Sequence, residues 1–210
     1  MFIGDGARAH SGHTQSMNAD LAPGLLLASP ALGDPNFSRS VVLLAQHDEE
    51  GALGWVLNGR ALGPAGELLR KAGLVPSGAR LPKGGSYGSP ARVGGPVMPG
   101  SAWLLYGRAP GQASWEGEHD LGGAFAVTAS KLAIDAVARG EGPDRFRVLL
   151  GYAGWGPGQI ETEIQSGAWL PAALDGDLLF RLDASELWEA AYQSSVGAMP
   201  ASFSASRGSA

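Results

Sequence analysis

The polar residues best suited to binding chemistry lie in a short loop between two apolar stretches. Residues 34–39 are polar except for Phe37. One interpretation is a structural clip, in which Asp34 accepts backbone N–H groups, Arg39 forms an ion pair and Phe37 fills the core. The other is a binding site. Its candidate residues are Asp34, Arg39, His47, Asn58, Tyr152 and Gln159. We favour the clip, because most polar loops of this kind are structural.

A site of the second kind would hold an anionic small molecule or a peptide of a partner protein. Arg39 would supply a fixed positive charge, and the amides of Asn58 and Gln159 would form hydrogen bonds. The glycine-rich residues 151–158 would form the facing wall. Two functions stay open. The chain is a non-enzymatic regulatory or interaction module, which we favour, or it is a small-molecule-binding protein or hydrolase with a site between residues 34–58 and 151–161.

Glycines at 151, 154, 156 and 158 separate an apolar run from an amphipathic segment, which predicts a strand, a tight turn and a helix. Such a junction can bind phosphate, but this one lacks the lysine of a P-loop and the G-x-G-x-x-G spacing. Glu161 and Glu163 fall in the first helical turn and would repel a phosphate. We therefore expect a structural turn, in which Gly154 or Gly156 adopts a conformation closed to other residues and Trp155 is buried.

The sequence contains no complete catalytic or metal-binding set. Residues 84–88 match G-x-S-x-G, but their proline-containing flanks cannot form the strand and helix of a nucleophile elbow. Cysteine is absent. His10 and His13 lie near the N-terminus, so a metal site would depend on His47 and His119, which are far apart in the sequence. We assign no catalytic residue, no metal and no cofactor, and the sequence favours a protein that is not an enzyme.

Short strands and isolated helices must position these residues. Strands are expected at 25–29, 40–46, 52–58, 102–106 and 124–128, and helices at 66–72, 130–138 and from 183 onward. The second and third strands form a hairpin whose turn contains Gly51, which is free to take a positive φ. Gly73 and Gly140 end the first two helices. This order favours an α+β fold with a mixed or antiparallel sheet.

Glycine accounts for 33 of 210 residues, about twice the usual share of ~7%. Many of these glycines fall within residues 78–100, which we expect to be a long, partly mobile surface connection. The length suits a single domain. We predict this domain at 20–197, with a disordered leader at 1–19 and a flexible tail at 198–210.

The net charge is −5, but residues 60–108 contain seven basic residues and one acidic residue. Such a segment can form a surface for an acidic partner, although we expect these side chains to point in several directions. The sequence lacks a helix-turn-helix pattern, so we expect no sequence-specific DNA binding. It also lacks a signal peptide and an apolar stretch of the ~20 residues that a membrane helix needs. We therefore expect a cytoplasmic protein without a membrane contact.

Three blocks of sequence occur in a fixed order. The first contains Pro30, Leu32, Asp34, Pro35, Phe37, Arg39, Ser40, Val41, His47, Gly51, Ala52, Gly54 and Asn58. The second is GGPV at 94–97, and the third is GYAGWGPGQIETEI from residue 151, followed by AWL. Together they resemble the YqgE/AlgH family of bacterial proteins, over roughly residues 20–197.

The resemblance implies a barrel-like sheet with helices packed around it. It also implies a set of structural motif residues: Phe37, Gly51, Gly54, Gly94, Gly95, Pro96, Gly151, Gly154, Trp155 and Trp169. The family carries the label of a putative transcriptional regulator, without a defined biochemical activity or partner.

Overall fold

The computed structural model describes residues 21–35, 37–180 and 183–196. The predicted leader and tail, with His10 and His13, lie outside these residues. The strands are β1 (Gly24–Ala28), β2 (Val41–Asp48), β3 (Gly51–Val56), β4 (Ala61–Pro64), β5 (Pro90–Val93), β6 (Val97–Gly107), β7 (His119–Asp120), β8 (Phe125–Thr128), β9 (Phe146–Trp155) and β10 (Trp169–Ala173). The helices are α1 (Ala65–Lys71), α2 (Gly85–Gly88), α3 (Lys131–Arg139), α4 (Gln159–Gln165), α5 (Gly176–Phe180) and α6 (Ala184–Val196).

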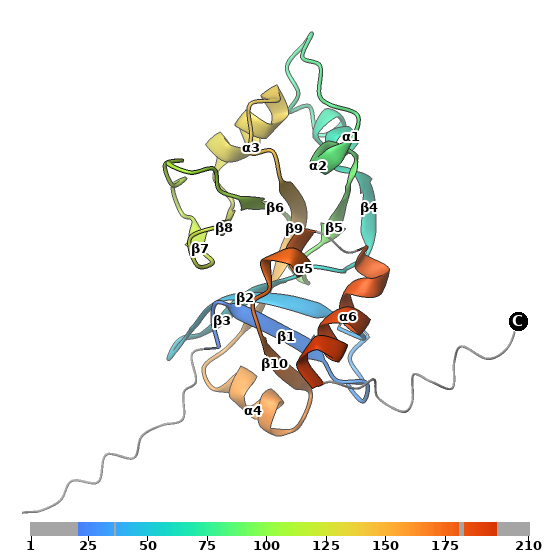
Figure 1. Cartoon of the computed structure of the whole chain (residues 1–210), viewed down its shortest axis with the longest axis vertical. Coiled ribbons are helices and arrows are strands. Elements are labelled where there is room, and N and C mark those ends of the chain that lie inside the picture. Colours follow the sequence, from blue (N-terminus) through green and yellow to red (C-terminus); the bar gives the residue numbers. More distant parts are fainter. Residues whose placement is uncertain (1–20, 36, 181–182, 197–210) are drawn as a thin grey trace, which may run out of the picture.

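The ten described strands form one sheet in the order β10-β1-β2-β3-β9-β6-β8-β7, with β5 beside β9 and β4 beside β5. The pairing is antiparallel except between β5 and β9. Strand β9 joins the two ends of the molecule, because it pairs with β6 and β5 through its first part and with β3 through its last residues. Helices α4 and α6 lie beside β1 and β10, and α1, α2 and α3 lie at the other end (Figure 1). The predicted α+β fold with a mixed, largely antiparallel sheet is confirmed.

The predicted hairpin at 40–58 is confirmed as β2 and β3. Its turn requires glycine for two reasons. Gly51 has φ 135°, and a Cβ at this position would lie 2.1 Å from the carbonyl oxygen of Trp155. Thus the hairpin turn lies directly against the end of β9, and only a residue without a side chain fits there.

The predicted helix ends are confirmed at α1 and α3. Gly73, with φ 71°, follows α1, and Gly140, with φ 80°, ends α3 in the left-handed conformation. Both positions favour glycine, because a Cβ is strained at positive φ. Helix α3 buries Ala133 and Val137 against the sheet, as expected of an amphipathic helix.

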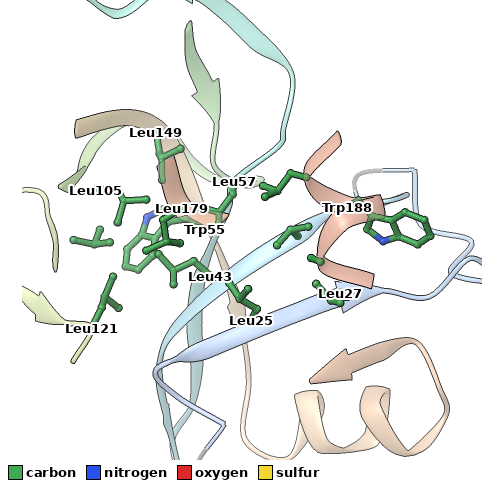
Figure 2. Packing of buried hydrophobic residues seen from close by; sticks show 14 residues of the cluster. Leu25, Leu27, Leu43, Trp55, Leu57, Leu105, Leu121, Leu149, Leu179 and Trp188 are labelled. Atoms are coloured by element: carbon green, nitrogen blue, oxygen red, sulfur yellow. The ribbon is translucent and has the colours of Figure 1, made fainter. Parts of the chain in front are cut away.

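The core contains two buried tryptophans in one cluster. Trp55 of β3 and Trp188 of α6 are both fully buried and belong to one cluster with leucines of β1, β2, β6 and β9 (Figure 2). The indole Nε1 of Trp188 donates to the carbonyl oxygen of Ala28 at 2.9 Å. Burying a large aromatic side chain whose N–H has a partner stabilises the fold strongly. Helix α6 is thereby fixed on β1.

The prediction that residues 78–100 form a long surface connection is wrong. This segment contains α2, β5 and the start of β6. The ring of Tyr87 of α2 packs edge-on against Phe146, with ring centroids 4.9 Å apart. Its hydroxyl donates to the carbonyl oxygen of Val137 at 2.9 Å. Gly94 and Gly95 serve close packing of backbones, since a Cβ on Gly95 would lie 2.2 Å from the carbonyl carbon of Tyr152. These two glycines therefore indicate tight packing.

The glycine tract on β9 differs from the prediction in one respect. The residues with positive φ are Gly151 at 70° and Gly158 at 69°, so the assignment to Gly154 or Gly156 is wrong. Gly151 takes this conformation because its backbone packs against Gly95, whose carbonyl oxygen would lie 2.5 Å from a Cβ at 151. The predicted burial of Trp155 is confirmed, with 6% of its surface exposed.

Candidate functional site

Two of the six candidate residues meet at the end of the 34–40 loop. The side-chain amide of Asn58 donates to the carbonyl oxygen of Arg39 at 2.8 Å and accepts from the backbone N–H of Val41 at 2.9 Å. Arg39 has φ 51°, a left-handed conformation that is uncommon for any residue except glycine. Asn58 thus holds a strained loop in place. The backbone N–H of Phe37 donates to the carbonyl oxygen of the exposed Asp34 at 3.1 Å, which closes the preceding turn.

His47 lies near the end of β2 and contacts helix α4. Its Nε2 lies 2.8 Å from Glu161 Oε1, and its side chain is largely buried. The backbone N–H of Glu161 itself and the hydrogen bond from His47 lower the pKa of this carboxyl. Glu161 thus stays ionised at neutral pH and joins the hairpin to α4. His119 lies elsewhere, against the rings of Trp55 and Trp103, and burial lowers its pKa.

Gln159 belongs to a second network, which centres on Glu163. Gln159 accepts from the backbone N–H of Gly156 at 3.0 Å and donates to Glu163 Oε1 at 2.8 Å. The other oxygen of Glu163 accepts from the indole N–H groups of Trp155 at 3.0 Å and Trp169 at 2.7 Å. Glu163 therefore supplies an acceptor to two buried indoles. Sequence reasoning missed this role, although two tryptophans in one motif require two acceptors.

Phe37 packs against both indoles, with ring centroids 6.3 Å from Trp155 and 5.4 Å from Trp169. This contact is the core plug that the clip interpretation expects. Tyr152 lies on β9 and packs against Trp103, with ring centroids 6.1 Å apart. The structure therefore brings Arg39 and Asn58 together, and it places His47, Gln159 and Tyr152 in three other contacts.

A cavity of about 430 Å³ lies beside the Arg39–Asn58 contact. It is formed by three segments that are distant in the sequence: the 35–40 loop, the end of β3 with the residues that follow, and the 93–96 segment. The described residues that line it are Pro35, Ser38, Ser40, Val56, Asn58, Gly59, Arg60, Val93, Gly95 and Pro96. Five residues of the first two family-like blocks thus line one cavity: Pro35, Ser40, Asn58, Gly95 and Pro96.

The backbone around this cavity is held by close packing. Gly94 donates to the carbonyl oxygen of Leu150 at 2.6 Å and accepts from the N–H of Val56 at 2.7 Å. A Cβ on Gly94 would lie 2.7 Å from the carbonyl oxygen of Gly151. The GGP segment therefore fits between β3 and β9 only because its first two residues lack side chains. It forms a rigid wall of the cavity.

Ser40 is the unusual residue of this cavity. It is 3% exposed, and its hydroxyl has no hydrogen-bond partner among the described residues. A buried hydroxyl without a partner is unfavourable by about 1–3 kcal/mol. Arg60 is exposed at the rim and adds a positive charge. The described lining residues include neither histidine nor a carboxylate, so these side chains can bind a ligand but offer no general base.

Other groups considered from the sequence have structural contacts. The Ser86 hydroxyl donates to the carbonyl oxygen of Asp144 at 3.1 Å and accepts from the N–H of Phe146 at 2.8 Å, so it fastens α2 to β9. In the described part of the chain, no group of three or more His, Cys, Asp or Glu residues could hold a metal ion. No helix of these residues is both long and apolar enough to cross a bilayer.

Three arginines of residues 60–108 have contacts at named places in the structure. Arg60 lines the cavity described above, Arg92 donates to the carbonyl oxygen of Gly59 at 2.9 Å, and Arg108 pairs with Glu118 and Asp120. The expectation that the segment forms no single basic surface stays a prediction.

Comparisons with known proteins give a consistent result. The family model described as AlgH-like matches residues 25–200. A UPF0301 protein of Anaeromyxobacter dehalogenans is 41% identical over 192 residues, which cover 88% of this chain and 92% of that protein. A UPF0301 protein of Xanthomonas campestris is 39% identical over 171 residues, which cover 81% and 87%.

Two solved structures are similar. The solution structure of the AlgH protein from Pseudomonas aeruginosa has a TM-score of 0.68 and 32% identity, over 93% of this chain and 99% of that one. A crystal structure from Corynebacterium diphtheriae has a TM-score of 0.64 and 20% identity, over 86% and 87%, and supports the fold alone. None of these names states an activity.

Proposed function

This chain belongs to the AlgH-like family, and we propose that it is a non-enzymatic regulatory module that binds a carboxylate-bearing ligand. The binding site is the cavity between the 35–40 loop and the 93–96 segment. The observation that carries this proposal is that Ser40 lines the cavity and that its buried hydroxyl has no hydrogen-bond partner among the described residues.

The chemistry of the cavity favours a carboxylate. A Ser40 hydroxyl can donate to a carboxylate oxygen, and the Arg60 guanidinium at the rim can pair with the negative charge. The amide of Asn58 is already used twice within the protein. It therefore positions the loop and does not bind the ligand itself. This assignment keeps the anionic ligand of the sequence-based hypothesis but replaces Arg39, Asn58 and Gln159 as its contacts.

The rigidity of the site supports a binding role. The loop is held by Asn58 on one side, and the opposite wall is held by the packing of Gly94 and Gly95 against β9. A preformed site loses little conformational entropy when a ligand binds. Regulation follows from such a site if the ligand changes the surface of the 35–40 loop that a partner protein contacts.

The proposal can be tested by thermal shift with paired probes. Small mono- and dicarboxylates are compared with their amides at about 10 mM, a concentration that detects weak affinity. Short peptides with free and amidated C-termini form a second arm. We expect carboxylates to raise the Tm and amides to leave it unchanged. A rise in Tm with the small carboxylates indicates a metabolite as the ligand, and a rise only with the free peptides indicates the C-terminus of a peptide.

Two variants make the result specific. Ser40→Ala removes an unpaired buried hydroxyl, so it should leave the Tm of the free protein equal or higher while removing the response to carboxylates. Arg60→Gln should weaken the response. Arg80→Gln, another exposed arginine, is the matched control. A carboxylate response that survives in both Ser40→Ala and Arg60→Gln, or no response to any probe, would refute this site.

A further inference from the structure

An apolar cavity of about 250 Å³ lies between the helices α1 and α3 and the strands β6 and β9. Both helices lie at the same end of the molecule (Figure 1). Leu68 and Leu69 of α1 line this cavity, and so do Ile134 and Val137 of α3. None of its described lining residues also lines the cavity beside Ser40. The two cavities are therefore separate sites.

The floor of the apolar cavity is formed by paired residues of β6 and β9. Ala102 lies opposite Leu150, and Leu104 lies opposite Val148, in the antiparallel register. Residues two apart on a strand point to the same face, so these four side chains lie on one face of the sheet. Leu104 is 1% exposed and Val148 is 7% exposed, and both belong to a core cluster with residues of α1 and α3. The floor of the cavity is thus part of the core.

The open side of the cavity lies where α1 ends. Ala72, Leu74 and Gly100 line the cavity and are exposed, Leu74 by 38%. An exposed leucine alone needs no explanation, but one at the mouth of an apolar cavity extends the apolar surface that a ligand can cover. The cavity therefore reaches from solvent to the core.

The lining leaves no polar side-chain group free. Trp103 is the one described lining residue with a polar side-chain atom, and its indole N–H donates to Ser101 Oγ at 3.1 Å. A polar group of a ligand buried here would lose its water without gaining a hydrogen bond from a side chain, which is unfavourable. An engineered apolar cavity of about 150 Å³ binds benzene, so this cavity has room for a larger apolar group. The lining therefore selects an apolar chain or ring.

The charge near the open side is positive. Lys71 follows Leu68 by three residues on α1, so their side chains are neighbours on the helix surface. Lys71 is exposed and takes part in no ion pair among the described residues. Residues 68–104, which contribute most of the lining, contain no acidic residue. On α3, Asp135 is already paired with Lys131 at 2.6 Å. An anionic group at the mouth would thus find a positive charge without a competing carboxylate.

We propose that this cavity binds a free medium-chain fatty acid, with its chain between α1 and α3 and its carboxylate beside Lys71. The chain covers apolar surface of the floor, and each buried methylene tightens binding by about threefold to fourfold. The carboxylate stays at the mouth, where it keeps part of its water and pairs with the lysine. This proposal is independent of the carboxylate site beside Ser40, because it concerns another cavity and other residues.

Isothermal titration calorimetry on the full chain with straight-chain carboxylates tests the proposal. The protein carries Ser40→Ala, so that the cavity beside Ser40 does not contribute to the binding of carboxylates. The probes are acetate, butanoate, hexanoate and octanoate at up to about 10 mM, with 1-octanol as the uncharged comparison. We expect the affinity to rise by about threefold to fourfold for each methylene added between butanoate and octanoate.

Two substitutions that fill the cavity make the result specific. Ala72→Phe at the mouth and Ala102→Leu on the floor add apolar atoms to the space that the chain would occupy. Each should weaken the binding of octanoate by at least about tenfold without lowering the Tm, because filling a cavity is commonly stabilising. Ala113→Phe, at an exposed alanine outside the lining, is the matched control and should leave the affinity unchanged.

The role of the charge is tested separately. Lys71→Gln should weaken the binding of octanoate by about twofold to fivefold and leave that of 1-octanol unchanged. Lys83→Gln, at another exposed lysine, should change neither. The proposal is overturned if octanoate binds no more tightly than butanoate, or if a folded filling variant keeps the affinity for octanoate. It is also overturned if Ala113→Phe weakens binding as much as the filling variants, or if Lys71→Gln leaves the binding of octanoate unchanged.

Discussion

Removing the carboxylate of Glu163 should destabilise this protein far more than its position on a short helix suggests. One oxygen of Glu163 accepts from the indole N–H groups of Trp155 and Trp169, and the other accepts from Gln159. The two tryptophans are 6% and 3% exposed, so neither indole N–H can easily turn to water. In Glu163→Ala both donors lose their acceptor.

The magnitude follows from these contacts. A hydrogen bond to a charged group contributes about 1.5–3 kcal/mol, and a buried donor left without a partner is unfavourable by about 1–3 kcal/mol. Because water can reach part of the space that Glu163 vacates, we expect a loss of about 3–5 kcal/mol for the two indoles together. At about 2–4 °C per kcal/mol for a chain of this length, the Tm should fall by roughly 6–20 °C.

Urea denaturation followed by tryptophan fluorescence and circular dichroism measures this loss directly. Glu163→Gln keeps one acceptor oxygen for both indoles, so it should lose only about 1–2 kcal/mol. Gln165→Ala, an exposed position on the same helix, controls for changes in helix propensity. A loss below about 1 kcal/mol for Glu163→Ala would mean that the indoles find other acceptors, and the reasoning would be refuted.

Three further outcomes follow from the described contacts. Trp155→Ala should lose about 3–5 kcal/mol in the same urea assay, as expected for a buried large aromatic. Gly95→Ala should destabilise the fold or prevent expression, because its Cβ would lie 2.2 Å from the carbonyl carbon of Tyr152; an unchanged Tm would contradict the close packing. The pKa of Glu161 is lowered from 4.5 in the folded protein, so its stabilising effect is present above pH 4.5 and is lost as the pH falls through the lower, folded value. The Tm difference between wild type and Glu161→Gln should therefore shrink as the pH falls below 4.5, and a constant difference would exclude this role.

The parts of the fold that could be predicted depend on local signals. The β2–β3 hairpin follows from two apolar runs around Gly51, and the ends of α1 and α3 follow from Gly73 and Gly140. Each of these features requires only a few neighbouring residues. The elements within residues 78–100 were not predicted, because two of its glycines, Gly94 and Gly95, are required by residues distant in the sequence. Gly95, for example, is required by Tyr152 on another strand.

At the candidate site, too, some residues could be predicted from the sequence, and contacts that depend on distant segments could not. The loop at 34–40 and Asn58 were identified from residue types alone, and the structure brings Arg39 and Asn58 together. The unpaired hydroxyl of Ser40 could not be predicted, because it depends on which groups of β3 and of the 93–96 segment lie near it in the fold. A cavity of about 580 Å³ that Arg92 and Arg147 line was also missed, because these two residues come together only through the parallel pairing of β5 and β9.

The position of β1 has a consequence for synthesis of the chain on the ribosome. All five residues of β1 are buried, and the strand is covered along one edge by β10 and over one face by Trp188 of α6. These partners are translated near the end of the described chain, after every other strand. The nascent chain therefore carries an apolar strand with one unpaired edge through most of its synthesis, a species that favours aggregation or a chaperone contact. Because the first strand pairs with the last, the sheet can close only after nearly the whole domain has left the ribosome.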